Sequence, residues 1–295
     1  MDYSWLKGVG TALVTPFDQD TIDKTSLQRI VKYNLDEGVD FLVPLGTTGE
    51  TSTLTDAECR QVLNIVLESK GSQVPVVSGV FGKNNTRVVL DMIRQADFDG
   101  IDAILVASPY YNKPSQAGLI AHFTTIADAS PRPVILYNVP SRTSVNLNAE
   151  TTLQLAEHPN IIANKEASGD FNLILQVLKH KPEDFYILSG DDPITLPMIA
   201  CGAVGVISVI SNAFPGYFTK AIDAALQSDF KTAKEYNDLL LDVHKWLYIE
   251  GNPVGIKACL SLLGFCSPEV RLPLVPLSAA NTEALAAAIR SLRPL

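Results

Sequence analysis

Histidine, cysteine and long apolar runs are scarce in this sequence, and each scarcity excludes a class of protein. Four histidines and four cysteines are spread along 295 residues without a C-x-x-C or H-x-x-x-H pair. This spacing argues against a disulfide framework and a protein-built metal site, and it predicts buried thiols in a reducing compartment. No apolar run reaches membrane-spanning length, and the amino-terminal segment lacks the features of a secretory signal. We therefore predict a cytoplasmic protein without a membrane partner.

The usual signatures of nucleotide binding are also missing. Neither G-x-x-x-x-G-K-[ST] nor G-x-G-x-x-G occurs in the chain, although these loops are the common phosphate cradles. The formal net charge is -9, which argues against the basic surface that DNA or RNA requires. We predict no nucleic-acid partner.

Short runs rich in Val, Ile and Leu alternate with segments of helical periodicity. Near-continuous apolar runs are typical of strands covered on both faces of a parallel sheet. Eight such strands predict an α/β protein with a (β/α)8 TIM barrel over residues 1–224. An open doubly wound sheet is the alternative, but it more often carries a glycine-rich loop after its first strand. Only helical patterns follow, so residues 225–295 are predicted to form a C-terminal helical domain. The runs begin at Gly10, Phe41, Val74, Ala103, Pro133, Ile161, Tyr186 and Gly205.

Local patterns predict several element boundaries. Residues 24–38 place apolar side chains on one helical face and end at Gly38, where a helix would terminate. Thr55 and Glu58 have the spacing of a capping box. The segments "EGVDFLVPLG" from Glu37 and "DGIDAILVAS" from Asp99 share an order of acidic, Gly, β-branched, Asp and apolar residues, which indicates a repeated β-α unit.

Lys165 stands at the end of the apolar run "IIANKE", at the edge of the barrel where enzymes of this fold carry their active sites. A neutral lysine amine is a nucleophile, and low-dielectric surroundings favour it, so Lys165 is a candidate for imine formation with a carbonyl compound. On this residue alone, a snorkelling lysine or an ion pair with Glu166 is equally consistent. Tyr137 ends the preceding strand and lies beside Lys165 if neighbouring strands pair in register. Its phenol would then transfer protons, although a packed core tyrosine is the plainer interpretation.

Polar residues also crowd the ends of other predicted strands. "GTTGE" places Thr47 and Thr48 between two glycines, which suits either a neutral cradle for a carboxylate or an ordinary turn. Arg142 follows "NVPS", and its planar fork suits a carboxylate with two hydrogen bonds, although a surface ion pair is the default for a loop arginine. Tyr110 and Tyr111 form an aromatic pair that is either functional or merely packed.

Taken together, "GTTGE", "SPYYNKPSQ", "YNVPSRT", "NKEASGD" and "LSGDD" resemble the dihydrodipicolinate synthase family in order and position. This family belongs to the pyruvate-dependent class I aldolases, which include N-acetylneuraminate lyase. The resemblance extends from Gly8 to Arg271 and implies a barrel enzyme that uses no cofactor, because pyruvate itself forms the imine with Lys165.

The resemblance also implies a role for each site residue. Tyr137, Thr47 and Tyr111 would form a proton relay, with Tyr111 supplied by a neighbouring subunit. Thr48 would hold the pyruvate carboxylate, and Arg142 the carboxylate of aspartate semialdehyde. The remaining expected substrate contacts are Gly190 and Ile207.

Arg142 favours the lysine-biosynthetic synthase over N-acetylneuraminate lyase, because the lyases tend to carry a different residue there. Another pyruvate-dependent aldolase and a non-catalytic barrel that binds a ligand remain as alternatives. The resemblance further implies a homotetramer built as a dimer of dimers. Asn84 and Tyr110 match an allosteric lysine site, but three other positions depart from lysine-sensitive members, which leaves inhibition by lysine open. These are Asp56, Cys59 and Val88.

Overall fold

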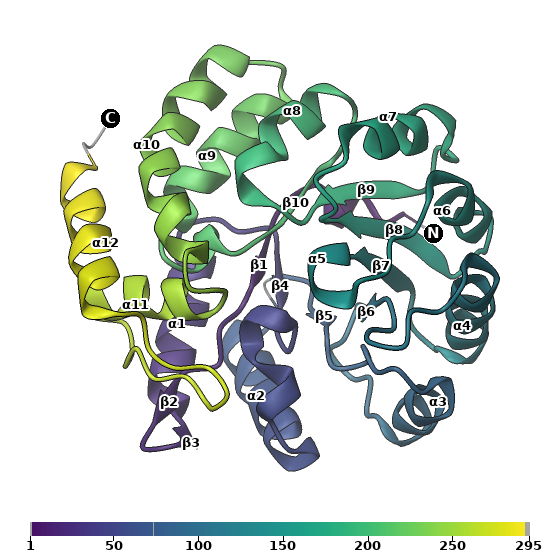
Figure 1. Cartoon of the computed structure of the whole chain (residues 1–295), viewed down its shortest axis with the longest axis horizontal. Coiled ribbons are helices and arrows are strands. Elements are labelled where there is room, and N and C mark those ends of the chain that lie inside the picture. Colours follow the sequence, from purple (N-terminus) through teal and green to yellow (C-terminus); the bar gives the residue numbers. More distant parts are fainter. Residues whose placement is uncertain (1, 73, 293–295) are drawn as a thin grey trace.

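The computed structural model describes residues 2–72 and 74–292, within which eight parallel strands form a barrel (Figure 1). They pair in the order β4-β1-β10-β9-β8-β7-β6-β5, and a parallel bridge between Leu42 and Val76 joins the two ends. Each strand overlaps one of the eight apolar runs, so the predicted barrel is confirmed. The strands are β1 (Gly8–Ala12), β4 (Phe41–Val43), β5 (Val77–Ser78), β6 (Ala103–Ala107), β7 (Val134–Asn138), β8 (Ile161–Glu166), β9 (Tyr186–Ser189) and β10 (Gly205–Ser208).

Helices surround the barrel and continue beyond it (Figure 1). Those between and after the strands are α1 (Lys24–Asp36), α2 (Asp56–Lys70), α3 (Thr86–Gln95), α4 (Gln116–Ala129), α5 (Pro140–Thr143), α6 (Ala149–Ala156), α7 (Phe171–His180), α8 (Thr195–Ala200) and α9 (Pro215–Leu226). Three further helices follow, α10 (Phe230–Tyr248), α11 (Val254–Leu262) and α12 (Ala279–Ser291). Among the described residues, none of the helices combines the length and apolar character needed to cross a bilayer.

The C-terminal helices share an apolar core with the barrel. Ile222 of α9, Leu240 of α10 and Leu285 of α12 are fully buried in one cluster with residues of α1 and α2. The C-terminal helical region is therefore packed onto the barrel and helps to bury its outer helices. The predicted division at residues 224/225 falls in the last turn of α9 and stays a prediction.

The local patterns explain where the elements begin and end. Helix α1 buries Leu27 and Ile30 completely, and Gly38 follows it with a φ of 85° that favours glycine. The Thr55 side chain accepts the Glu58 N–H while the Glu58 carboxylate accepts the Thr55 N–H, which completes the predicted capping box at the start of α2.

The repeated strand entry has a structural basis. The carboxylate of Asp40 accepts the N–H of Val9 at 2.7 Å, and that of Asp102 accepts the N–H of Val76 at 2.8 Å. In both units an aspartate before a strand therefore satisfies the backbone of the neighbouring strand. The two segments therefore share a residue order because each aspartate makes the same contact with the backbone next to it in the barrel.

Two expectations are corrected by the structure. The run from Gly10 continues as a strand only to Ala12, after which the chain forms a small hairpin of β2 (Phe17–Asp18) and β3 (Thr21–Ile22). Pro16 lies between these elements, where its missing N–H removes a ladder donor. The expected burial of all four thiols is also wrong, because Cys201 is exposed and Cys266 is half-buried.

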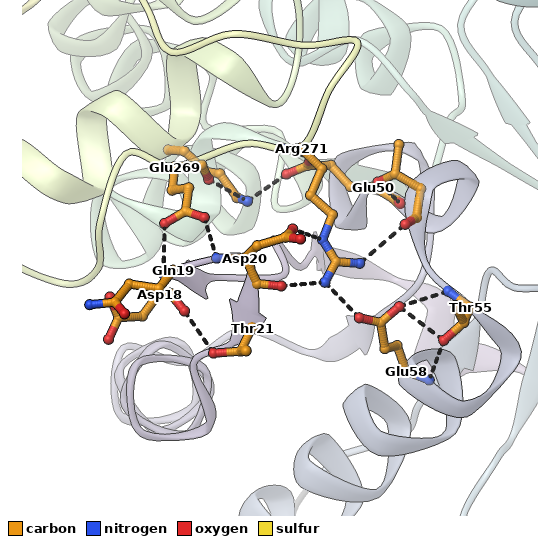
Figure 2. A network of polar contacts seen from close by, with 11 residues as sticks. Asp18, Gln19, Asp20, Thr21, Glu50, Thr55, Glu58, Glu269 and Arg271 are labelled. Carbon is orange, nitrogen blue, oxygen red and sulfur yellow. Dashed lines mark hydrogen bonds and ion pairs between the residues drawn. The ribbon is translucent and has the colours of Figure 1, made fainter.

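Arg271, in the segment before α12, ties the C-terminal region to the barrel (Figure 2). Its guanidinium donates to the carboxylate of Asp20 at 2.7 Å, to that of Glu58 at 2.6 Å and to the carbonyl of Thr53 at 3.1 Å. The Glu269 carboxylate accepts the N–H of Asp20. The hydrogen bond from Arg271 lowers the pKa of Glu58 from 4.5 to about 2.

This shift predicts a pH-dependent contribution to stability. A lowered folded-state pKa stabilises the fold above the unfolded pKa near 4.5, and the contribution is lost as pH falls toward 2. Glu58→Gln retains a capping-box residue but removes the charge. We expect it to lower the free energy of unfolding at pH 7 by about 1 kcal/mol or less, because solvent screens the pair. Urea unfolding at several pH values measures this difference. A difference between variant and parent that does not change from pH 7 to pH 3 would contradict the assignment.

Candidate active site

The carboxyl ends of β7 and β8 bring the two central candidates together. Tyr137 and Lys165 are direct partners in the parallel register of these strands. The Lys165 Nζ lies 4.3 Å from the centre of the Tyr137 ring, and the residues are only 6% and 7% exposed. The predicted juxtaposition of an amine and a phenol is therefore present. Among the described residues the Tyr137 hydroxyl makes no hydrogen bond, so it remains available to a substrate.

Glu166 is not the partner of Lys165. Its buried carboxylate accepts the N–H of Ser168 at 2.7 Å and the side-chain amides of Asn138 and Asn164 at 3.0 to 3.1 Å. Adjacent residues in a strand face opposite sides, which separates the two charges. Burial raises the pKa of the Glu166 carboxyl. Within residues 2–72 and 74–292, Lys165 forms no ion pair, so the ion-pair interpretation does not hold.

A hollow of about 360 Å³ opens at this end of the barrel. Thr47, Tyr137 and Arg142 all contribute to its lining, together with Tyr110 and Gly79. The structure thus brings a hydroxyl from the end of β4 and a phenol and a guanidinium from the end of β7 to one cavity. Lys165 adjoins the cavity through its contact with the Tyr137 ring.

Thr48 follows Thr47 in a short turn after β4 and is 3% exposed. Its hydroxyl oxygen accepts a hydrogen bond of 3.0 Å from the side-chain amide of Asn252. The backbone carbonyl of Asn252 in turn accepts one of 3.3 Å from the Arg142 guanidinium. Asn252 therefore contacts two predicted substrate-binding residues, although no motif in the sequence marks it.

Gly190 lies close to Lys165, and Ile207 packs in the same cluster as Tyr137. A Cβ added to Gly190 would lie 2.8 Å from the Ala167 Cβ and 3.0 Å from the Lys165 Cε. Ile207 of β10 is 1% exposed and belongs to the apolar cluster that includes Tyr137. Only a residue without a side chain leaves the stem of Lys165 its present space.

Of the remaining candidates, Tyr110 and Tyr111 lie on the loop after β6, and Asn84 lies on the loop after β5. Tyr111 is 89% exposed, with a φ of 71°, and does not line the cavity. The Asn84 side chain donates to the Tyr110 carbonyl at 2.6 Å and accepts the Tyr110 N–H at 2.7 Å. Asn84 and Tyr110, expected at an allosteric site, thus lie together and fix the backbone that carries Tyr111. Their regulatory role stays a prediction.

Residues 5–292 match the sequence model of the dihydrodipicolinate synthetase family. This chain belongs to that family. A relative from Phocaeicola vulgatus named 4-hydroxy-tetrahydrodipicolinate synthase is 47% identical over 290 residues, covering 98% of this chain and 97% of that protein. The resemblance inferred from the five motifs is therefore confirmed.

Solved structures of dihydrodipicolinate synthases share the whole fold. One, described as a monomeric variant, superposes with a TM-score of 0.94 at 36% identity and covers 97% of both chains. Another, from Acinetobacter baumannii in complex with pyruvate, has a TM-score of 0.93 at 36% identity and covers 97% of this chain and 98% of that chain.

The space around Lys165 yields a test. Gly190→Ala places a methyl group 2.8 Å from the Ala167 Cβ and 3.0 Å from the Lys165 Cε, so Ala167 must shift and the lysine stem is displaced with it. A misplacement of about 1 Å can slow a reaction by about a hundredfold, and we expect the imine formation with pyruvate that the resemblance implies to slow by up to that order. Mass spectrometry of borohydride-trapped protein measures the rate. Gly118→Ala in α4, where the added atom makes ordinary contacts of 3.4 Å and more, is the control and should react at the wild-type rate. A wild-type rate in Gly190→Ala would show that the glycine is not required.

Proposed function

We propose that this chain catalyses the Schiff-base condensation of pyruvate with L-aspartate 4-semialdehyde, as a 4-hydroxy-tetrahydrodipicolinate synthase of lysine biosynthesis. The observation that carries the proposal is the buried amine of Lys165, which lies over the Tyr137 ring and forms no ion pair within residues 2–72 and 74–292. A lysine in this setting suits nucleophilic attack on a carbonyl carbon. The names of the similar proteins support the choice of reaction over N-acetylneuraminate lyase.

In the first step the Lys165 amine attacks the keto carbon of pyruvate. The carbinolamine then loses water as its hydroxyl takes up a proton, and an imine results. The Tyr137 phenol and the Thr47 hydroxyl line the cavity, where they transfer protons between the amine, the departing water and solvent. The Thr48 hydroxyl holds the substrate carboxylate. Loss of a proton from the pyruvate methyl group converts the imine into a nucleophilic enamine.

In the second step the enamine carbon attacks the aldehyde of aspartate semialdehyde. Arg142 lines the cavity, where its guanidinium binds the carboxylate of this second substrate. The amine of the substrate then displaces Lys165 by transimination, which closes the ring and restores the free lysine. The imine with Lys165 accepts the electron pair that the methyl proton leaves behind, so the proposed route uses neither a metal nor an organic cofactor.

The exposure of Tyr111 supports a role for subunit assembly in completing the active site. A tyrosine that is 89% exposed beside a cavity is available to the site of a neighbouring copy, and we propose a homotetramer in which Tyr111 completes the proton relay of the adjacent subunit. The monomeric variant among the similar structures offers a comparison for whether assembly affects turnover. We further propose that the enzyme works in the cytoplasm.

Trapping tests the imine directly. Sodium borohydride added with pyruvate should leave a reduced adduct on the peptide that contains Lys165, detected as a mass increase in a peptide digest. Lys165→Arg keeps the charge but has no nucleophilic amine, and should form no adduct. An unmodified wild-type peptide at saturating pyruvate would refute the proposed route.

Arg142 tests the second substrate. Arg142→Ala removes a charge-assisted hydrogen-bonding group, so we expect the KM for aspartate semialdehyde to rise by about tenfold or more, with a much smaller change in the KM for pyruvate. Arg142→Lys keeps the charge without the planar fork, so its KM for aspartate semialdehyde should lie between those of the wild type and Arg142→Ala. Steady-state assays that vary one substrate at a time measure the split, and equal effects on both constants would contradict the assigned role.

A further inference from the structure

The loop that carries Thr47 and Thr48 has a strained backbone at both ends. Leu45 and Glu50 have φ values of 63° and 53°, in the left-handed region that residues with a side chain seldom adopt. Such conformations persist only where the surroundings hold them. Gly79 also approaches the loop so closely that an added Cβ would lie 2.7 Å from the Gly46 N and the Leu45 carbonyl oxygen. The shape of this loop therefore depends on contacts from elsewhere in the chain.

Two of these contacts come from residues 252–257 in the C-terminal helical region. The Asn252 side-chain amide donates to the Thr48 hydroxyl oxygen at 3.0 Å, across 204 residues of sequence. The Lys257 ammonium lies 2.5 Å from the Glu50 carboxylate, and both side chains are almost fully buried, at 0% and 1% exposed. Lys257 also donates to the Glu269 carbonyl, and the other Glu50 oxygen accepts the Arg271 N–H at 3.0 Å. Figure 2 shows Glu50 beside Arg271 at this junction.

The direction of the Asn252 hydrogen bond has a chemical consequence for Thr48. A hydroxyl group carries one proton and accepts through its oxygen. Because Asn252 donates to that oxygen, the Thr48 proton is free to point toward another acceptor. A carboxylate can only accept hydrogen bonds, so a donating hydroxyl is complementary to the carboxylate of pyruvate. The Lys257 ammonium also neutralises the Glu50 carboxylate, so the loop carries no net negative charge that would repel this substrate.

We propose that Asn252 is a positioning residue that makes the Thr48 hydroxyl a donor to the pyruvate carboxylate, while the buried Lys257–Glu50 pair holds the loop in its strained shape. The C-terminal helical region thereby forms part of the pyruvate site. This inference rests on the proposed function and deepens it.

The decisive variant is Asn252→Asp, which has nearly the same shape but accepts hydrogen bonds when ionised. The aspartate accepts a hydrogen bond from the Thr48 hydroxyl and so turns the hydroxyl proton away from the substrate. We expect the apparent KM for pyruvate to rise by about tenfold or more, while the KM for aspartate semialdehyde and kcat at saturating pyruvate change by less than about threefold. Lowering the pH should reduce the defect, because a protonated aspartic acid can donate again. Asn237→Asp, on α10 with the same 8% exposure, is the matched control and should keep the wild-type KM for pyruvate.

A double-mutant cycle separates positioning from general loss of structure. In a Thr48→Val background there is no hydroxyl to orient, so adding Asn252→Asp should raise the KM for pyruvate no further than Thr48→Val alone. Asn252→Ala removes the donor without adding charge and should give a smaller increase. If Asn252→Asp does not fold, Asn252→Ala replaces it in the double-mutant cycle with Thr48→Val.

The ion pair is tested by charge removal. Lys257→Met leaves an unpaired buried carboxylate, which should lower Tm and raise the KM for pyruvate. Adding Glu50→Gln removes that charge, so the double variant should regain much of the lost Tm and show a KM for pyruvate closer to that of the wild type. The absence of recovery would show that the pair does not hold the loop.

The outcomes distinguish the two proposals. If the wild-type protein forms no borohydride-trapped adduct with pyruvate, the proposed function fails. If it forms the adduct but Asn252→Asp keeps the wild-type KM for pyruvate, or if Asn237→Asp raises that KM equally, the positioning role fails while the proposed function stands.

Discussion

The candidate active site depends on a buried amine, that of Lys165, which pairs with no acidic group among the described residues. Two of the buried lysines, Lys257 and Lys165, have different surroundings. Lys257 contacts the Glu50 carboxylate and the Glu269 carbonyl, as expected for a buried charge that must be compensated. Lys165 instead faces the ring of Tyr137, and the nearest acidic residue in sequence is turned away and bonded to other groups. The same residue type therefore forms a buried ion pair in one place and faces an aromatic ring in the other.

Strand geometry produces this separation. Alternation along β8 places Lys165 and Glu166 on opposite faces, and the parallel register with β7 places Tyr137 directly beside the lysine. Closure of the sheet then brings strand ends from distant parts of the sequence around one cavity of about 360 Å³. Because parallel strands in a barrel share one carboxyl end, groups that follow β4, β7 and β8 converge without any local sequence relation.

The C-terminal helical region contributes both stability and organisation. It shares an apolar core with the outer helices, and Arg271 links it to the small hairpin and to α2. Residues 252–257 extend this attachment to the loop that holds Thr48. The contacts of residues 252–257 with this loop are buried, where hydrogen bonds and ion pairs are least screened by solvent. Folding of the C-terminal region and shaping of the cavity are thus parts of one network.

The sequence by itself determined the features that depend on neighbours along the chain. The eight apolar runs, the end of α1 at Gly38 and the capping box at Thr55 follow from periodicity and local hydrogen bonding, and the five motifs were sufficient to indicate the family. The tertiary structure alone decided that Asn252 contacts Thr48, that Lys257 pairs with Glu50, that Cys201 is exposed and that Glu166 faces away from the site. Contacts between residues about 200 positions apart leave no periodic signal in a single sequence, because they arise only when the closed barrel and the packed C-terminal helices bring those segments together.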